Sequence, residues 1–318
     1  MLAPLLRRTA ASLGVMVGAS ILVFAAIRLV PGDPITAMLG GAGLSDPQLV
    51  KEFRVSYGLD EPLPVQYWAW ASHVVTGDLG QSVSTREPVT QVVWRRLSAT
   101  LLLGGAALVV AVVVGLLWGV SGAYVSGAPG TFLRAAPLFV LAVPSFSIGV
   151  GLAFVFGVLL RVLPTSGMQT PLDGGSVPDV LAHMVLPALT LALYPAALTA
   201  RIAHGSIDEL RNEDFVRTAR AAGISDQRVM LRHILPNTLL PIITNGGVMV
   251  GYMLTAAVFV ESVFAWPGIG TLMVESVLGR DYPVVQASAL IVAGTFVTLS
   301  WLIDSFYVLV DPRIGTRR

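Results

Sequence analysis

Long runs of uncharged residues alternate with shorter polar segments along this chain. An apolar helix needs about 20 residues to cross the hydrocarbon core of a bilayer, and runs of this length recur through the sequence. One of them, Leu97–Leu133, is too long for a single crossing. A turn is predicted inside it at Gly127, Pro129 and Gly130. The pattern predicts six transmembrane helices with approximate bounds 9–29, 98–124, 135–160, 183–203, 237–261 and 283–307.

Prolines stand inside three of these predicted spans. They are Pro137 and Pro144 in the third, Pro187 and Pro195 in the fourth, and Pro241 in the fifth. Each proline removes an intrahelical hydrogen bond and can bend its helix. Neighbouring helices can satisfy the freed backbone groups in a membrane bundle. We interpret these prolines as structural, with movement at the bends as the alternative.

The composition agrees with a membrane protein. Hydrophobic residues make up 54% of the 318 residues and charged residues only 12%, which is about half the charged share of a typical soluble domain. That leaves too little charge to cover a globular surface of this size. The formal net charge of +1 points to no particular partner, and we expect none among nucleic acids.

The arginines orient the chain in the membrane. Basic residues concentrate in short cytoplasmic loops. With the N-terminus inside, most arginines fall on the cytoplasmic side, and the two short outer loops carry only Arg161 and Arg280. The long outer loop, residues 30–96, weighs little in this rule. Both termini are therefore predicted to be cytoplasmic.

The long outer loop contains signals for ordered structure. Ser45 and Gln48 have the spacing of a capping box at a helix start. A second short helix is predicted through Trp68 and Trp70, with its end near Gly77. Two tryptophans this close favour a helix in the headgroup region of the bilayer. A docking surface for an external partner is the alternative interpretation.

The loop between the fourth and fifth spans, residues 204–236, holds another short helix. In Arg217–Gly223, which reads RTARAAG, the small residues Thr218, Ala219 and Ala222 are predicted to share a face. Gly223 can adopt the left-handed conformation that ends a helix. Such a helix suits docking to a partner protein. A solvated linker and a basic helix resting on anionic lipid remain alternatives.

A second segment with distinctive residues precedes the sixth span. Glu261, Trp266, Pro267 and Gly268 lie together near the outer end of the fifth span. They are candidates for an outer entrance that receives a substrate. Trp266 is equally well interpreted as an anchor at the membrane interface, with Pro267 and Gly268 as its turn.

The residues needed for several kinds of chemistry are missing or scattered. The chain has no cysteine, which removes disulfides and thiolate chemistry. Its four histidines are dispersed along the sequence, so we expect no metal site and no catalytic residues. A P-loop needs glycines followed by a lysine. The only lysine, Lys51, follows Leu49 and Val50 instead. ATP hydrolysis is therefore expected in another chain.

The 204–236 loop resembles the cytoplasmic EAA loop of ABC-importer permeases, and the wider chain resembles the dipeptide/oligopeptide subfamily. Gly223 matches the glycine of that loop, and Thr218 and Ala219 stand at its two alanine positions. Arg217 occupies the position of the glutamate, which departs from the general pattern. The segments that carry the resemblance are Arg28–Pro34, Tyr57–Tyr67, Gly77–Ser82, Asp214–Asn237, Glu261–Gly270, Arg280–Gln286 and Asp311–Ile314.

This resemblance implies a single permease domain over residues 1–318 with the type I ABC-importer fold, in a bacterial inner membrane. It implies a second similar permease, two ATPase subunits and an external substrate-binding protein as partners. ATP and magnesium would bind in the ATPases, and this chain would need no cofactor of its own. The implied coupling residues are Arg217, Thr218, Ala219, Arg220, Ala222 and Gly223.

Two other classes of membrane protein are weighed against this one. Ion-coupled transporters place ionisable residues inside their spans. Here the spans are free of charge at mid-depth, since Glu261 and Asp304 lie near span ends. A sodium site made only of carbonyl oxygens stays conceivable. A receptor or channel has no selectivity-filter pattern to support it.

Overall fold

A computed structural model describes residues 2–29, 60–171 and 175–310 of the chain. These ranges are helical, and their strand content is one isolated bridge between Gln81 and Pro88. The chain divides into two compact units. The first consists mainly of residues 101–266 and 299–318, and the second of residues 2–100 and 267–298. One permease domain over residues 1–318 stays a prediction.

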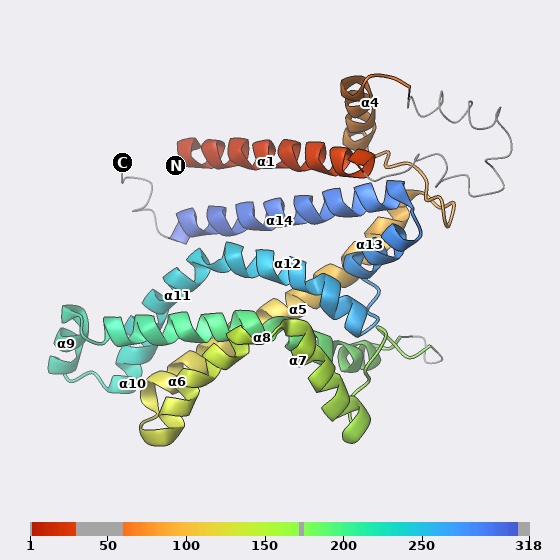
Figure 1. The fold of residues 1–318 in the computed structure, drawn as a ribbon. Coiled ribbons are helices and arrows are strands. Elements are labelled where there is room, and N and C mark those ends of the chain that lie inside the picture. The colour runs from red at the N-terminus through yellow and green to blue at the C-terminus, as the bar shows by residue number, and fades with distance from the viewer. Residues whose placement is uncertain (1, 30–59, 172–174, 311–318) are drawn as a thin grey trace. The chain divides into compact units, whose positions relative to one another are not determined.

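The long helices of the structure correspond to the predicted spans. Five of them are long and apolar enough to cross a membrane, and a bent pair of shorter helices makes up to six spans. The five are α1 (Leu2–Leu29), α5 (Val89–Tyr124), α8 (Val177–Leu210), α12 (Gly246–Val263) and α14 (Tyr282–Val310) (Figure 1).

The predicted span 135–160 falls on a bent pair of helices. In this pair, α6 (Gly127–Ala142) is followed by α7 (Ser145–Leu152), which continues in the π-helical segment η1 (Ala153–Leu159). The two halves meet at 106°. Pro144 accounts for the break, because a proline disfavours the helical conformation of the residue before it. Val143 is accordingly extended, with a ψ of 131°.

The predicted span 237–261 is also two helices. They are α11 (Leu235–Thr244) and α12, which meet at Asn245. By contrast α8 runs unbroken through Pro187 and Pro195. The presence of a proline in a span therefore does not by itself decide whether the helix is broken.

The second unit is held together by α4 and by a cluster of valines. Tyr67 and Trp70 of α4 (Leu63–Val75) pack on the Phe24 ring of α1, with ring centroids 5.4 and 5.7 Å away, and α4 runs across the end of α1 (Figure 1). Trp68 of the same helix is 71% exposed. The predicted short helix in the outer loop is thus present, whereas the capping box at Ser45 and Gln48 lies outside the described residues.

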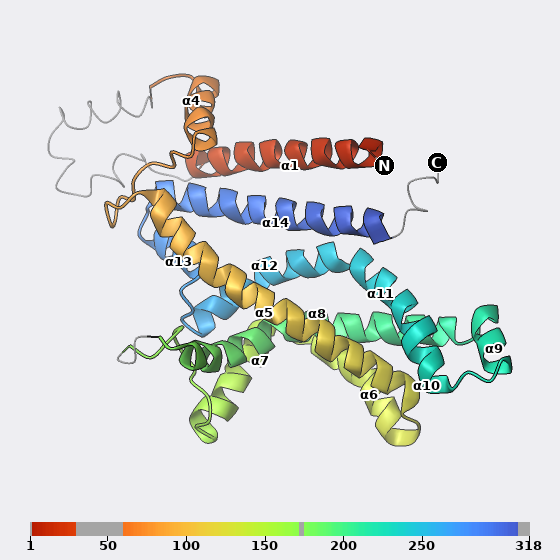
Figure 2. The same cartoon turned by 180° about the vertical axis from the view of Figure 1, so that it is seen from behind.

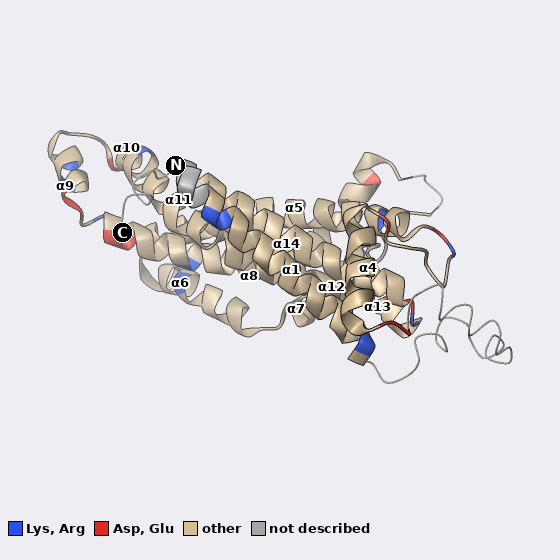
Figure 3. Cartoon of the chain, turned by 90° about the horizontal axis from the view of Figure 1, so that it is seen from above, with Lys and Arg blue, Asp and Glu red and all other residues tan. Residues whose placement is uncertain are grey.

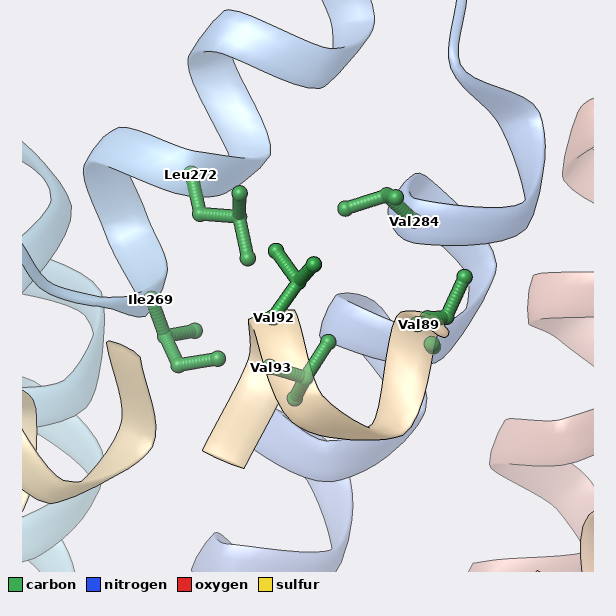
Figure 4. Packing of buried hydrophobic residues seen from close by; sticks show 7 residues of the cluster. Val89, Val92, Val93, Ile269, Leu272 and Val284 are labelled. Atoms are coloured by element: carbon green, nitrogen blue, oxygen red, sulfur yellow. The ribbon is translucent and has the colours of Figure 1, made fainter. Parts of the chain in front are cut away.

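The valine cluster joins the start of α5 to the helices that follow residue 267. Val89, Val92 and Val93 of α5 point toward Ile269 and Leu272 of α13 (Ile269–Leu278) and toward α14 (Figure 4). The Thr100 hydroxyl accepts a hydrogen bond of 2.8 Å from the backbone amide of Ile269. This contact holds the first turn of α13 against α5.

The first unit is built around α8. Gly115 and Gly119 of α5 lie on the backbone of α8, where an added β-carbon would come within 2.7 Å of the carbonyl oxygens of Ala196 and Ala200. Small residues four apart let two membrane helices approach this closely. Figure 2 shows α5 crossing α8. The C-terminal half of α5 is therefore packed closely on the C-terminal half of α8.

Candidate functional site

The predicted cytoplasmic helix is present as α9 (Asp214–Ala221). It ends in a hydrogen-bonded cap. The amide of Gly223 donates to the carbonyl of Arg220 at 2.9 Å, and that of Ile224 donates to the carbonyl of Ala219 at 3.2 Å. This is the Schellman pattern, which needs a left-handed residue at the position of the glycine. Gly223 supplies it with a φ of +79°.

At the start of α9, Glu213 occupies the N-cap position and makes no side-chain capping bond. Asp214 lies in the first turn. A carboxylate there favours the helix through the partial positive charge at its N-terminus.

One face of α9 is buried in an apolar cluster. Val216 is fully buried and packs with Ile207 of α8. The cluster also takes in residues of α10 (Asp226–Val229) and the π-helical turn η2 (Met230–Ile234), and Val120 and Ala123 of α5. Because α5 approaches α8 closely at Gly115 and Gly119, the residues of α5 and α8 in this cluster belong to a closely packed pair of helices. The buried face of α9 therefore contacts both of them.

The predicted shared face of small residues is wrong for Ala219. This side chain is only 8% exposed and packs with Val216, whereas Thr218 and Ala222 are exposed. Successive helical residues are turned by about 100°, so Thr218 and Ala219 cannot both face outward. The exposed coupling candidates are Arg217, Thr218, Arg220, Ala222 and Gly223.

The charges of this region lie at its surface. Arg217 is paired with Asp214 at 3.6 Å, and Arg220 with Asp226 at 2.9 Å. Exposed pairs of this kind stabilise a fold by at most about 1 kcal/mol, so they leave both arginines available to a partner. The sequence analysis does not place Asp226 on this surface. Its position three residues after the helix-ending Gly223 is the local signal that could have indicated it.

A partly buried contact ties the end of α8 to the end of α5. The Arg211 guanidinium donates to the backbone carbonyl of Ala123 at 2.9 Å. It thereby satisfies one of the free carbonyls that every helix C-terminus leaves. Figure 3 shows the charged residues of this unit around α9 and α10, while the middle turns of α8 and α12 carry none.

The second predicted segment, Glu261–Gly268, points inward. Glu261 and Trp266 are both 0% exposed, and Gly268 is buried as well. The amide of Trp266 donates to the Glu261 carbonyl at 2.8 Å, across a turn in which Ala265 has a φ of +46°. The interpretation of Trp266 as an exposed interfacial anchor is therefore wrong. The role of this segment at an outer entrance stays a prediction.

Within the described ranges no group of three or more histidine, aspartate and glutamate residues is placed to hold a metal ion. The α9 region combines an exposed helix face that carries Arg217 and Arg220 with a buried apolar face that packs this helix against α5 and α8.

Comparisons with known proteins identify the family of this chain. Residues 74–316 match the family described as "Binding-protein-dependent transport system inner membrane component", and residues 1–104 match the description of its N-terminal part. The di/tripeptide transport system permease protein DppB of Pseudomonas aeruginosa is 36% identical, with 100% of both chains covered. The glutathione transport system permease protein GsiC of Pectobacterium atrosepticum is 37% identical, with 92% of both chains covered.

A solved structure shows the same fold at lower identity. The inward-facing MetNI methionine ABC transporter matches with a TM-score of 0.52 and 16% identity, covering 70% of this chain and 96% of that chain. This likeness concerns the fold alone, which is that of a type I ABC-importer permease. The chain belongs to the inner membrane components of binding-protein-dependent transport systems.

Proposed function

We propose that this chain is the permease subunit of an ATP-driven importer of di- or oligopeptides. The observation that carries the proposal is the seating of α9: its buried face joins it to α5 and α8, and its other face is exposed. The relatives named for di/tripeptide and glutathione transport support peptides as the substrate class.

In this proposal, energy enters through partner subunits. Two cytoplasmic ATPases bind and hydrolyse ATP with magnesium, and each permease receives one of them on its α9 surface. Closure of the ATPases moves α9, and the apolar cluster around Val216 carries this movement to α5 and α8. Interiors packed this closely transmit displacement because they have little free volume.

The remaining partners complete the importer. A second, similar permease encloses the translocation path with this one, and an external binding protein delivers the peptide. Both termini face the cytoplasm, as the arginine distribution favours. The Glu261–Gly268 segment belongs to the outer side in this arrangement.

Reconstitution tests this proposal. The chain is assembled in proteoliposomes with the permease, ATPases and binding protein encoded beside it, and uptake of a radiolabelled dipeptide is followed. Accumulation that requires ATP, and that stops when the ATPases are left out, is the expected result. Uptake by this chain alone, driven by an ion gradient, would contradict the proposal.

A further inference from the structure

We infer that Ser145, Tyr194 and Tyr252 form a contact site for the transported peptide midway across the membrane. The inference rests on the proposed function and assigns residues to its translocation path. The three side chains come from α7, α8 and α12, and all belong to the first unit. Figure 1 shows these three helices meeting at one place.

The two tyrosines form a stacked pair. Their ring centroids are 3.8 Å apart and their planes differ by 16°. The Ser145 side chain lies beside the Tyr252 hydroxyl. Both rings are only partly buried, so part of the pair is open to its surroundings. An aromatic surface with hydroxyl groups at its rim can contact both apolar and polar parts of a ligand.

The position of this cluster is unusual for a tyrosine. Tyrosines in membrane proteins gather at the two interfaces, where their hydroxyl groups reach water. Tyr194 instead lies midway along α8, and Ser145 follows the break between α6 and α7 in the middle of the bent span. Three hydroxyl groups at this depth mark a polar path rather than a surface that faces lipid tails.

The Tyr194 hydroxyl adds the most direct argument. Among the residues that the structure describes, no hydrogen-bond partner is found for this hydroxyl. A polar group without a partner in hydrocarbon is costly, so such groups face a bundle interior or a water-filled cavity. A ligand or water therefore completes the hydrogen bonding of Tyr194.

The chemistry of the cluster suits a peptide. Hydroxyl groups donate to the carbonyl and carboxylate oxygens of a peptide and accept from its amides. The exposed ring faces take up side chains of varied shape. The middle turns of α8 and α12 carry no charged residue (Figure 3), so the site holds a peptide weakly enough to release it toward the cytoplasm.

Paired substitutions test this site in the complete importer. Tyr194→Phe and Tyr252→Phe keep the rings and remove the hydroxyl groups, and Tyr124→Phe, at the cytoplasmic end of α5, is the matched control. Each site variant should lower the maximal rate of dipeptide uptake about fivefold, as expected for one lost hydrogen bond. The control should keep the wild-type rate. All variants should keep normal assembly and ATPase stimulation by the loaded binding protein.

A change of peptide preference distinguishes contact from a structural role. The site variants should alter the uptake ratio of alanylphenylalanine to dialanine, because the lost hydroxyl makes the surface that meets the peptide side chain less polar, whereas general damage lowers both rates equally. A dipeptide carrying a benzophenone side chain should label α7, α8 or α12 in vanadate-arrested complexes.

Two results would overturn the site. One is wild-type rates and an unchanged peptide ratio in both tyrosine variants. The other is benzophenone labelling confined to other helices or to the second permease. If the wild-type complex accumulates no peptide at all, the proposed function itself fails.

Discussion

The sequence contains two segments with distinctive residues, one around α9 and one around Trp266. The two segments differ in whether these residues are exposed or buried. In α9 the distinctive residues Arg217, Thr218 and Gly223 are exposed, and an ordinary valine carries the packing. In the other segment Glu261 and Trp266 are themselves fully buried. In α9 the distinctive residues are free to contact a partner because apolar residues such as Val216 pack beneath them. In the other segment the distinctive residues themselves form the packed interior.

The largest expected effect comes from the buried segment. Trp266→Ala removes a fully buried side chain, and truncations of this kind cost about 3–5 kcal/mol. We expect a sharp fall in the amount of folded permease recovered from membranes, measured by size-exclusion chromatography in detergent. The matched control is Trp68→Ala, whose side chain is 71% exposed and whose loss should leave the yield near normal. Equal yields for the two variants would contradict the conclusion that the Trp266 segment forms part of the packed interior.

A smaller and more local effect is expected beneath α9. Val216→Asp buries an unpaired carboxylate in the apolar cluster, which costs several kcal/mol. The helix should detach while the membrane spans stay folded, because Val216 is the fully buried residue of α9 in this cluster and the Arg220–Asp226 pair at the surface is weak. The measurement is copurification of the ATPases with tagged permease, which should be lost. Val216→Ile keeps the apolar contact and should retain them. Normal ATPase binding by Val216→Asp would show that the seating of α9 is irrelevant to docking.

A still finer effect is expected on the exposed side. Gly223→Asp and Gly223→Asn have nearly the same shape, and both residues tolerate the left-handed backbone better than most. An added β-carbon meets nothing within 4 Å in this chain. We therefore expect both variants to be inserted and abundant.

The charge alone then separates these two variants. The aspartate should abolish dipeptide uptake because a carboxylate would be buried against the ATPase, whereas the asparagine should retain part of it. Gly205→Asp, an exposed position in α8 with open space around it, controls for added charge on the cytoplasmic side. Equal uptake by the Gly223→Asp and Gly223→Asn variants would remove the argument for a desolvated contact there.

Local signals explain what the sequence could predict. The end of α9 follows from a glycine flanked by apolar residues, and the long spans follow from uncharged runs. These features need no knowledge of neighbouring helices. The family resemblance located the same loop independently.

The features that the sequence did not predict depend on contacts between helices. Pro144 breaks its span while Pro187 and Pro195 do not, because the outcome depends on whether neighbours satisfy the freed carbonyls. Tyr194 and Tyr252 come into contact through packing of α8 against α12. Their spacing in the sequence therefore could not predict the stacked pair. The inward position of Ala219 was accessible in principle, since Val216 lies three residues before it.

The most direct test of the account is the accessibility of one side chain on α9. The chain has no cysteine, so Thr218→Cys gives a unique thiol on the exposed face. It should react rapidly with a maleimide in the isolated permease and become protected when the ATPases assemble. In intact cells a membrane-impermeant maleimide should leave it unlabelled while labelling Gly77→Cys. Equal reactivity of Thr218→Cys with and without the ATPases, or labelling from outside the cell, would contradict α9 as the coupling surface.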